Sequence, residues 1–518
     1  AVVKKNTASL FLANAVRQPA MIQHYVHLVR RNKRRIQTLV AAGCAVICLG
    51  AGQSFSADYT DATPVQTRQI PLDKGRSLAV QALNNGNPVL AIEISRALWE
   101  ADKRDSATYA IVALAYAQMD NPKAARKAAA QAYRFTKVKP DRLQMAELAA
   151  RSSLREGRPT LTQIWLRRAA INTNDETATR QIAQDYGKVR QLNPWGFRLF
   201  GGLRPSDNVN SGSESGLQVI DGVPYVGRLS GVDQALSGLV GTIDAAVSYR
   251  LTVTKASSTS IGARAYVKRV ALSNAAKILA TPNPTPLDPN PTTPSNRGFG
   301  STFAEFSLKH SREIAGSKRN AIANYGLALG GSWYGHNTNY YFGWITAGRR
   351  WNLSDNTQLS FSGAFEVRDV PSSTLADSTV VSLTGGLVRH MAHGDTLRFM
   401  LTFADTDSDS NQRRYKSANV RADYQFKDTF GPKSLNAKIS AGLTVGYSDY
   451  EAYGFFPVAA PGGRQETSVY ADVTAVFQNI DYAGFVPAVT VRAGRKSSNV
   501  SRFNTKELSV SLGIQSKF

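Results

Sequence analysis

The feature that most constrains this chain is a long C-terminal region, from about Trp195 to Phe518, in which apolar and polar residues alternate. Near its end, Leu508, Val510, Leu512 and Ile514 fall on one face of an extended chain, and small or polar residues fall between them. A period of two indicates β-strands with one apolar face rather than helices. A chain of this kind must place its apolar faces against either a protein core or a lipid phase.

The alternating region divides into fourteen predicted strands. They are 195–203, 238–252, 258–270, 299–311, 320–334, 338–351, 356–369, 377–391, 395–406, 415–427, 436–449, 466–479, 483–495 and 506–518. An even number is typical of bacterial outer-membrane barrels, and a membrane-crossing strand needs about 9–11 residues. Lipid offers no hydrogen bonds to an open sheet edge, so the sheet must close. We therefore predict that residues 193–518 form a 14-stranded antiparallel transmembrane β-barrel.

The connections between these strands alternate in length. The longest ones, 204–237, 271–298 and 450–465, all follow odd-numbered strands and therefore share one end of the barrel. Long outer loops and short periplasmic turns are typical of this class. The outer loop at 281–296 is rich in proline, which predicts an extended segment outside the sheet. Both chain ends of the barrel are then periplasmic.

The last strand resembles the C-terminal insertion signal of outer-membrane barrels. Ser511, Gly513 and the terminal aromatic residue Phe518 carry this resemblance, whereas Ser516 stands where a hydrophobic residue is usual. The resemblance implies that the barrel assembly machinery is a partner, together with outer-membrane lipid and lipopolysaccharide.

The N-terminal residues 1–57 have the order of a secretory leader. A basic cluster at 30–35 precedes an apolar stretch, Ile36–Gly52, and a signal peptide cleaved near Ser56 or Ala57 is expected. A retained anchor, or lipidation at Cys44, are alternatives. Both cysteines of the chain lie in this stretch. Residues 58–73 follow as a linker.

Residues 74–192 are rich in good helix formers and contain an internal repeat. An Asn-Pro pair recurs at Pro88 and Pro122, and the spacing of 34 residues is that of tetratricopeptide repeats. In the second unit Tyr116, Ala125 and Ala132 are the expected packing residues, and Pro140 is expected to close the unit. About three units are expected in this α-helical domain, which we place in the periplasm.

The sequence offers little that indicates catalysis. No catalytic motif is found, and His390 and His393 are interpreted as residues of a solvated turn rather than metal ligands. We expect no enzyme activity, no metal site and no cofactor. The net charge of the chain is +24. Outside the leader the basic residues are scattered singly through the alternating segments, which favours a phosphate-rich membrane surface over nucleic acid as a partner.

A polar run at the start of the barrel carries a family resemblance. The segments Asn193-Pro-Trp195-Gly-Phe197 and Gly202-Leu-Arg-Pro-Ser-Asp207-Asn208-Val-Asn210 resemble the barrel entry of surface lipoprotein assembly modifiers. Members of that family combine a leader, a periplasmic tetratricopeptide domain and a C-terminal barrel. The resemblance implies a translocon that exports or displays a lipoprotein or related secreted protein. Asp207, Asn208 and Asn210 are the candidate entry-loop residues, although a simple turn is an equal alternative.

Three other functions remain open at this point. Polysaccharide-export porins also join tetratricopeptide repeats to a barrel, but usually with more repeats. A general solute channel would use the repeats only as a scaffold. A barrel hydrolase would need Ser and His side by side on one strand face, and a sequence alone does not reveal such neighbours.

Overall fold

The computed structural model describes residues 70–284, 292–316, 321–335, 337–432, 435–455, 458–480 and 485–516. The chain divides into two units, 1–69 and 70–518, and the second holds all of the described residues. The expected leader, most of the linker and Phe518 lie outside the described residues.

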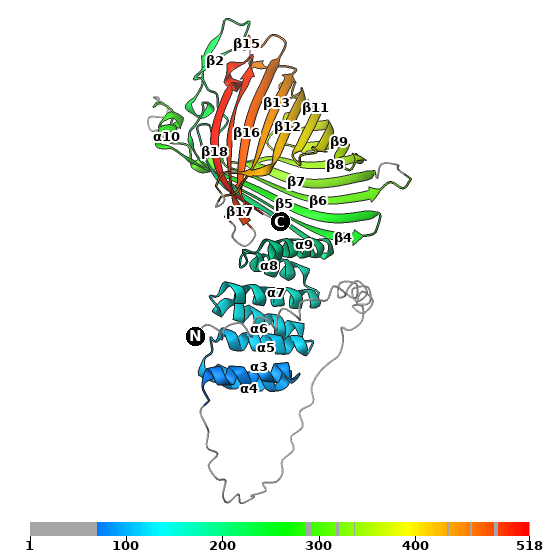
Figure 1. The fold of residues 1–518 in the computed structure, drawn as a ribbon. Helices are drawn as coiled ribbons and strands as arrows, with labels where there is room; N and C mark the ends of the chain where they lie inside the picture. The colour runs from blue at the N-terminus through cyan, green and yellow to red at the C-terminus, as the bar shows by residue number, and fades with distance from the viewer. Residues whose placement is uncertain are drawn as a thin grey trace, which may run out of the picture. The chain divides into compact units, whose positions relative to one another are not determined.

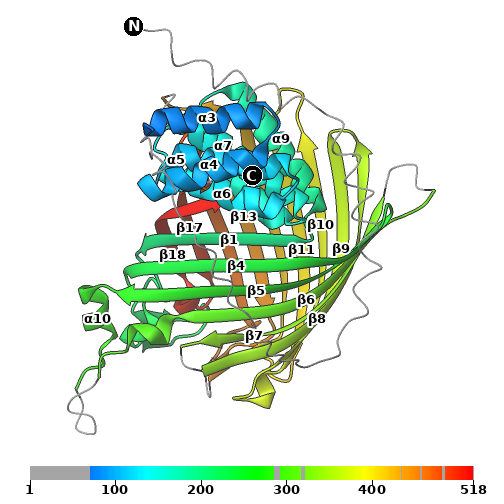
Figure 2. The same cartoon turned by 90° about the horizontal axis from the view of Figure 1, so that it is seen from below.

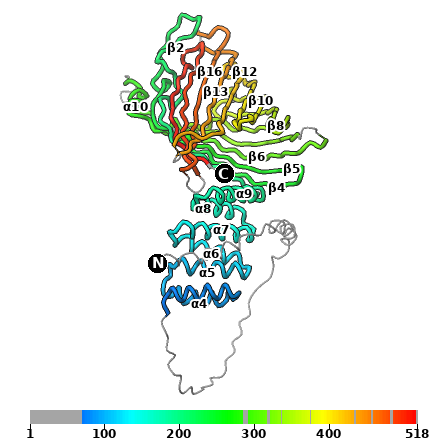
Figure 3. Tube along the Cα trace, in the orientation of Figure 1, coloured from blue at the N-terminus to red at the C-terminus, as the bar shows by residue number. Residues whose placement is uncertain are grey.

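Helices occupy the first part of the described chain (Figure 1). They are α3 (Leu72–Asn84), α4 (Pro88–Ala101), α5 (Ser106–Gln118), α6 (Pro122–Phe135), α7 (Lys139–Arg155), α8 (Pro159–Ala170) and α9 (Glu176–Leu192). Each helix contacts the next one along the chain, so α3 to α8 form three successive hairpins that α9 follows (Figure 3).

The repeated Asn-Pro pair starts the second helix of the first two hairpins in the same way. The Asn87 side chain accepts a hydrogen bond from the N–H of Leu90, and Asn121 accepts one from the N–H of Ala124, both at 3.1 Å. Proline follows each asparagine at the first helical position, where the absent N–H costs nothing. The 34-residue repeat of the sequence is thus a repeated helix cap.

Alanines make up much of the helical core. Ala125 and Ala132 of α6 are 0% and 1% exposed, and their small size lets the paired helices approach closely. Tyr116 is only partly buried and packs at the edge of this core. Pro140 is exposed in the first turn of α7, so it starts the third hairpin and takes no part in the packing of the second.

Fourteen antiparallel strands then close into a barrel, and the fold class predicted from the sequence is confirmed. The strands are β1 (Trp195–Ser206), β4 (Gly238–Val253), β5 (Ser257–Leu272), β6 (Ser301–Glu313), β7 (Ile322–Tyr334), β8 (Asn337–Ser354), β9 (Thr357–Asp369), β10 (Ser378–His390), β11 (Thr396–Ser408), β12 (Tyr415–Phe430), β13 (Ala437–Tyr450), β16 (Arg464–Phe477), β17 (Phe485–Ser498) and β18 (Thr505–Ser516). The first and last strands, β1 and β18, pair with each other and complete the cylinder (Figure 2).

The connections contain regular structure that the sequence did not predict. They hold the two-stranded sheets β2–β3 (Leu217–Val219, Val226–Arg228) and β14–β15 (Gly454–Phe455, Val458–Ala459). They also hold helix α10 (Asn274–Ala280) and the short 3-10 helices η2 (Gly231–Asp233), η3 (Asn296–Phe299), η4 (Thr374–Ala376) and η5 (Ser501–Phe503). Of the proline-rich loop, residues 285–291 lie outside the description.

The two faces of the barrel wall differ as the alternation requires. On β9, Leu359, Phe361, Phe365 and Val367 point outward and are 38–51% exposed, while the residues between them face the interior. Such an apolar outer belt is what a lipid phase demands. None of the described helices is both long and apolar enough to span a membrane.

The two ends of the barrel also differ. At the short-turn end, where the chain enters from α9, the connections run from 2 residues at 355–356 to 8 at 314–321. At the long-loop end, the three longest connections are 207–237, 273–300 and 451–463. This alternation matches the predicted one, with boundaries shifted by a few residues because the strands extend further than the apolar pattern does.

Candidate functional site

A groove lies across α4, α5 and α6 in the helical domain. Its volume is about 550 Å³, and its lining includes Trp99, Tyr109, Tyr116, Arg126 and Lys127. The rings of Trp99 and Tyr109 lie 5.1 Å apart. The indole N–H of Trp99 is buried and has no hydrogen-bond partner in the described structure. We call this surface the helical groove; it combines an aromatic floor with a basic edge.

The basic edge is partly fixed by an ion pair. The Nε of Arg126 donates to Glu156 at 2.8 Å and its Nη2 donates at 3.3 Å. The hydrogen bond from Arg126 holds the pKa of Glu156 below its ordinary value, and this effect outweighs the opposing effect of burial. Lys127, in contrast, is exposed on α6 and has no ion pair among the described residues, so it is free to meet a bound partner.

Asn193 joins the helical domain to the barrel. Its side chain accepts from the N–H of Trp195 at 3.1 Å and donates to Gln163 of α8 at 2.7 Å. Its carbonyl and that of Gln191 accept hydrogen bonds from the guanidinium of Arg250, near the end of β4. The C-terminal end of α9 is therefore held by a cation from the barrel wall, which suits the negative end of a helix.

The candidate entry-loop residues organise the first long loop, 207–237. Asn208 donates to the carbonyl of Gly212 at 2.9 Å and accepts from its N–H at 2.8 Å. Asn210 donates to Gln234 and accepts from Leu236 across the loop. Asp207 accepts from the N–H of Leu508 on β18 at 3.3 Å. These side chains hold the loop in one shape, and their polar groups are used by the protein itself.

The first long loop, 207–237, also contacts two other loops at the long-loop end of the barrel. Ile220 and Val500 are 1% and 0% exposed and form a small apolar cluster with Ala460. The carboxylate of Asp233 accepts from Arg502 at 2.9 Å, and Glu214 accepts from Arg495 at 2.5 Å. The loops 207–237, 451–463 and 499–504 therefore form one folded layer at the long-loop end.

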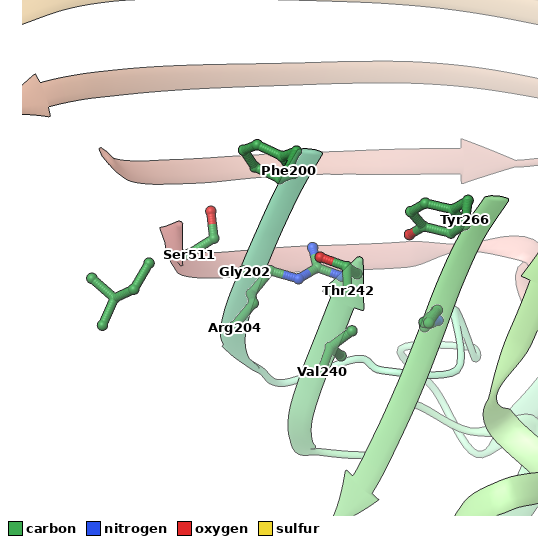
Figure 4. A pocket seen from close by; sticks show the side chains of 9 residues that line it. Phe200, Gly202, Arg204, Val240, Thr242, Tyr266 and Ser511 are labelled. Atoms are coloured by element: carbon green, nitrogen blue, oxygen red, sulfur yellow. The ribbon is translucent and has the colours of Figure 1, made fainter. Parts of the chain in front are cut away.

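A second cavity, of about 320 Å³, lies inside the barrel where β1 and β18 meet (Figure 4). Phe200, Arg204, Tyr266 and Ser511 project toward it. Arg204 is bonded to Glu507 and donates to Ser509 at 3.3 Å. The cavity therefore has aromatic and polar walls but no cluster of reactive side chains.

The residues proposed for the insertion signal have distinct places on β18. Ser511 faces this cavity, and its hydroxyl donates to the carbonyl of Thr490 at 3.3 Å. Gly513 pairs with Gly202 across the β1–β18 contact, where an added Cβ would lie 3.1 Å from the carbonyl oxygen of Gly201. That these residues act as an insertion signal for barrel assembly stays a prediction.

The two histidines near the turn at 391–395 have separate partners. His390 contacts the hydroxyl of Thr396 at 3.0 Å, whereas His393 contacts Asp395 at 2.9 Å. Within the described ranges, no group of three His, Cys, Asp or Glu side chains could hold a metal ion.

The repeats predicted an extended docking groove in the helical domain, but the sequence identified neither the residues that line it nor the role of Arg250. The groove residues come from three helices, and each one alone has the pattern of a core aromatic or a surface cation. Arg250 contacts residues about 57–60 positions earlier in the chain. A weak signal for the groove is the recurrence of aromatic residues at 99, 109 and 116 within a domain otherwise rich in alanine.

No protein-family model matches the chain, and no curated protein matches its sequence. Among solved structures, the type III secretion translocator chaperone SycD of Yersinia enterocolitica is 16% identical, with a TM-score of 0.22; the match covers 23% of this chain and 83% of SycD. A bacterial polysaccharide outer membrane secretin is 9% identical, with a TM-score of 0.32; the match covers 62% of this chain and 98% of the secretin chain. OccAB3 of Acinetobacter baumannii is 11% identical, with a TM-score of 0.30; the match covers 61% of this chain and 98% of OccAB3.

These similarities are too low to identify a family, so the class rests on the architecture of the chain itself. A closed antiparallel barrel with an even number of strands, an apolar outer belt and a polar interior defines an outer-membrane β-barrel. This barrel follows an N-terminal domain of helical hairpins.

Proposed function

We propose that the protein is an outer-membrane translocon that exports or displays a lipoprotein or a related protein client. The helical domain faces the periplasm and docks the client, and the barrel provides the path across the membrane. The observation that carries this proposal is the helical groove. An aromatic floor with basic residues at its edge suits an extended segment with apolar side chains and acidic neighbours.

The connection between the two domains supports the same proposal. The segment that joins the helical domain to the barrel is fixed by hydrogen bonds on both sides. The Asn193 carbonyl accepts from Arg250 of the barrel, and the Asn193 side chain donates to Gln163 of α8. A client bound in the groove is thereby kept near the short-turn end of the barrel. A solute channel has no need for a docking groove that is attached to its entrance.

Copurification tests the proposal directly. The full chain is purified from its native membrane in mild detergent, and bound proteins are identified by mass spectrometry. We expect an exported lipoprotein or secreted protein to be enriched. The variants Tyr116→Ala and Lys127→Glu in the groove should lose it, while Arg96→Glu should keep it because Arg96 is exposed on α4 outside the groove.

Two outcomes contradict the proposal. Equal client recovery from the groove variants and from Arg96→Glu would show that the groove does not dock the client. Enrichment of a polysaccharide in place of any protein would favour the polysaccharide-export alternative.

A further inference from the structure

Most of the carboxylates that face the barrel interior in the described strands are paired with arginines. Six of them have an arginine nitrogen within 3.1 Å, and they are Asp244, Glu366, Asp423, Glu466, Asp472 and Glu507. A seventh, Glu305, accepts from the indole of Trp344 at 3.3 Å and lies opposite Arg264 in the strand register. Paired in this way, these acids contribute little net negative potential to the interior.

Four inward-facing cations near the short-turn end have no such partner. Lys309 of β6, Arg350 of β8, Arg398 of β11 and Lys438 of β13 lie on the same strand faces as the paired acids, as the register shows. Across the described ranges, none of the four makes an ion pair within 4.0 Å. Each is within five residues of the short-turn end of its strand. We call these four residues the inner basic belt.

The surroundings of the belt leave its charge exposed to the interior. The Nε of Arg350 is buried and has no hydrogen-bond partner among the described residues. Arg398 makes one long contact, to the amide oxygen of Gln425 at 3.4 Å. The acids in the described strand ends and turns at this end are Glu313, Asp355, Asp428 and Asp395, and Asp395 already accepts from Tyr424 and His393. Asp423 lies opposite Arg398 in the strand register, but it accepts from Arg421. The basic residues in the same strand ends and turns are more numerous, because Arg250, Lys255, Arg312, Arg389 and Lys427 add to the four of the belt. The cations therefore outweigh the acids here.

We infer that the barrel interior conducts small inorganic anions and selects them over cations, and that the inner basic belt is the selectivity element. A barrel of fourteen strands is wide enough to leave space that side chains do not fill. Rings of lysine or arginine in a pore favour anions, because a low-dielectric wall of one sign concentrates ions of the opposite sign. This inference rests on the barrel alone and is independent of the translocon proposal.

The test is ion selectivity of the purified full chain in planar bilayers of phosphatidylcholine, with a KCl gradient. The reversal potential should have the sign of a chloride-selective pore. The single variants Lys309→Gln, Arg350→Gln, Arg398→Gln and Lys438→Gln should each lower the ratio of chloride to potassium permeability. The combined glutamine variant should bring this ratio close to one, and four glutamates should invert the sign of the reversal potential.

Arg349→Gln is the matched control. Arg349 is the neighbour of Arg350 but lies on the opposite strand face, with its guanidinium 5.1 Å from the Trp351 ring, so its loss should leave selectivity unchanged. Folding of each variant is checked by its heat-dependent shift on a gel. A wild-type chain that prefers potassium or does not conduct overturns the inference, as does an equal effect of Arg349→Gln and Arg350→Gln. Surface display of a client, measured separately, does not depend on this result.

Discussion

The helical domain and the barrel place the same kinds of residue in opposite ways. In the helices, small apolar residues such as Ala125 are buried, and arginines such as Arg96 lie at the surface. In the barrel, residues such as Leu383 and Phe361 are exposed outside, while arginines such as Arg421 are bonded inside. An apolar side chain exposed on a helix contacts water at a cost in free energy, whereas the outer face of the barrel requires apolar side chains because it contacts lipid.

This difference implies that one substitution has different costs in the two regions. A charge added to the outer belt must be removed from water, whereas a charge added to a helix surface or to the barrel interior need not be.

Leu383→Arg should produce the largest loss of stability. Leu383 lies near the middle of β10 and is 47% exposed on the outer face. An arginine at the bilayer midplane of a barrel costs about 2–4 kcal/mol. Thr384→Arg, one residue away on the inner face, should cost less than about 1 kcal/mol because the charge meets water there. Unfolding in lipid vesicles by denaturant measures both, and equal losses would contradict the assignment of the faces.

Arg126→Ala should destabilise the helical domain by about 2–3 kcal/mol. The side chains of Arg126 and Glu156 are only 15% and 8% exposed, so removing the cation leaves a carboxylate with little water around it. Arg180→Ala is the comparison, because its pair with Glu176 is exposed and spans 3.9 Å; such pairs contribute under about 1 kcal/mol. Helical circular dichroism during thermal unfolding distinguishes the two.

Gly330→Ala should weaken the barrel wall by about 1–3 kcal/mol, the usual cost of overpacking. A Cβ at position 330 would lie 2.1 Å from the carbonyl oxygen of Ala304 and 2.6 Å from the Phe342 ring. At Gly385, on β10, a Cβ would meet nothing within 4 Å, so Gly385→Ala should be nearly neutral. The temperature of the heat-dependent gel shift reports both, and matching temperatures would argue against the register of β6, β7 and β8 described above.

Glu147→Gln should give the smallest effect, with a pH dependence. Burial raises the pKa of Glu147 above its ordinary value of 4.5. A raised carboxyl pKa means that this residue favours folding below pH 4.5 and that the benefit is lost as the pH rises through the raised pKa. The melting temperature of the variant should therefore be higher than that of the wild type at neutral pH and equal to it at about pH 4. Glu93→Gln, an exposed change on α4, should alter neither value.

The contrast between the regions also explains what could be predicted from the sequence. Lipid on one side and water on the other impose a period of two on every strand, so the fourteen strands could be found from residues such as those of β9. The helix caps at Asn87 and Asn121 were visible because they repeat.

The loops and the groove could not be found in this way. The shape of the first long loop depends on contacts such as Ile220 with Val500, which are 280 positions apart in the chain. Likewise, the sequence shows Asn208 only as a polar loop residue. The structure shows that its side-chain amide forms two hydrogen bonds with the backbone of Gly212. The helical groove depends on how α4, α5 and α6 stack, and no local pattern encodes that stacking.

The most direct test of the translocon proposal is surface display in living cells. Three strains are compared: one with the full chain, one lacking the gene, and one with the barrel but without residues 74–192. Lipoproteins and secreted proteins at the cell surface are quantified by surface labelling and mass spectrometry, with barrel folding confirmed by its gel shift. We predict that the same client is lost from the surface of the last two strains. Unchanged display of every surface protein in both of them would contradict the proposal.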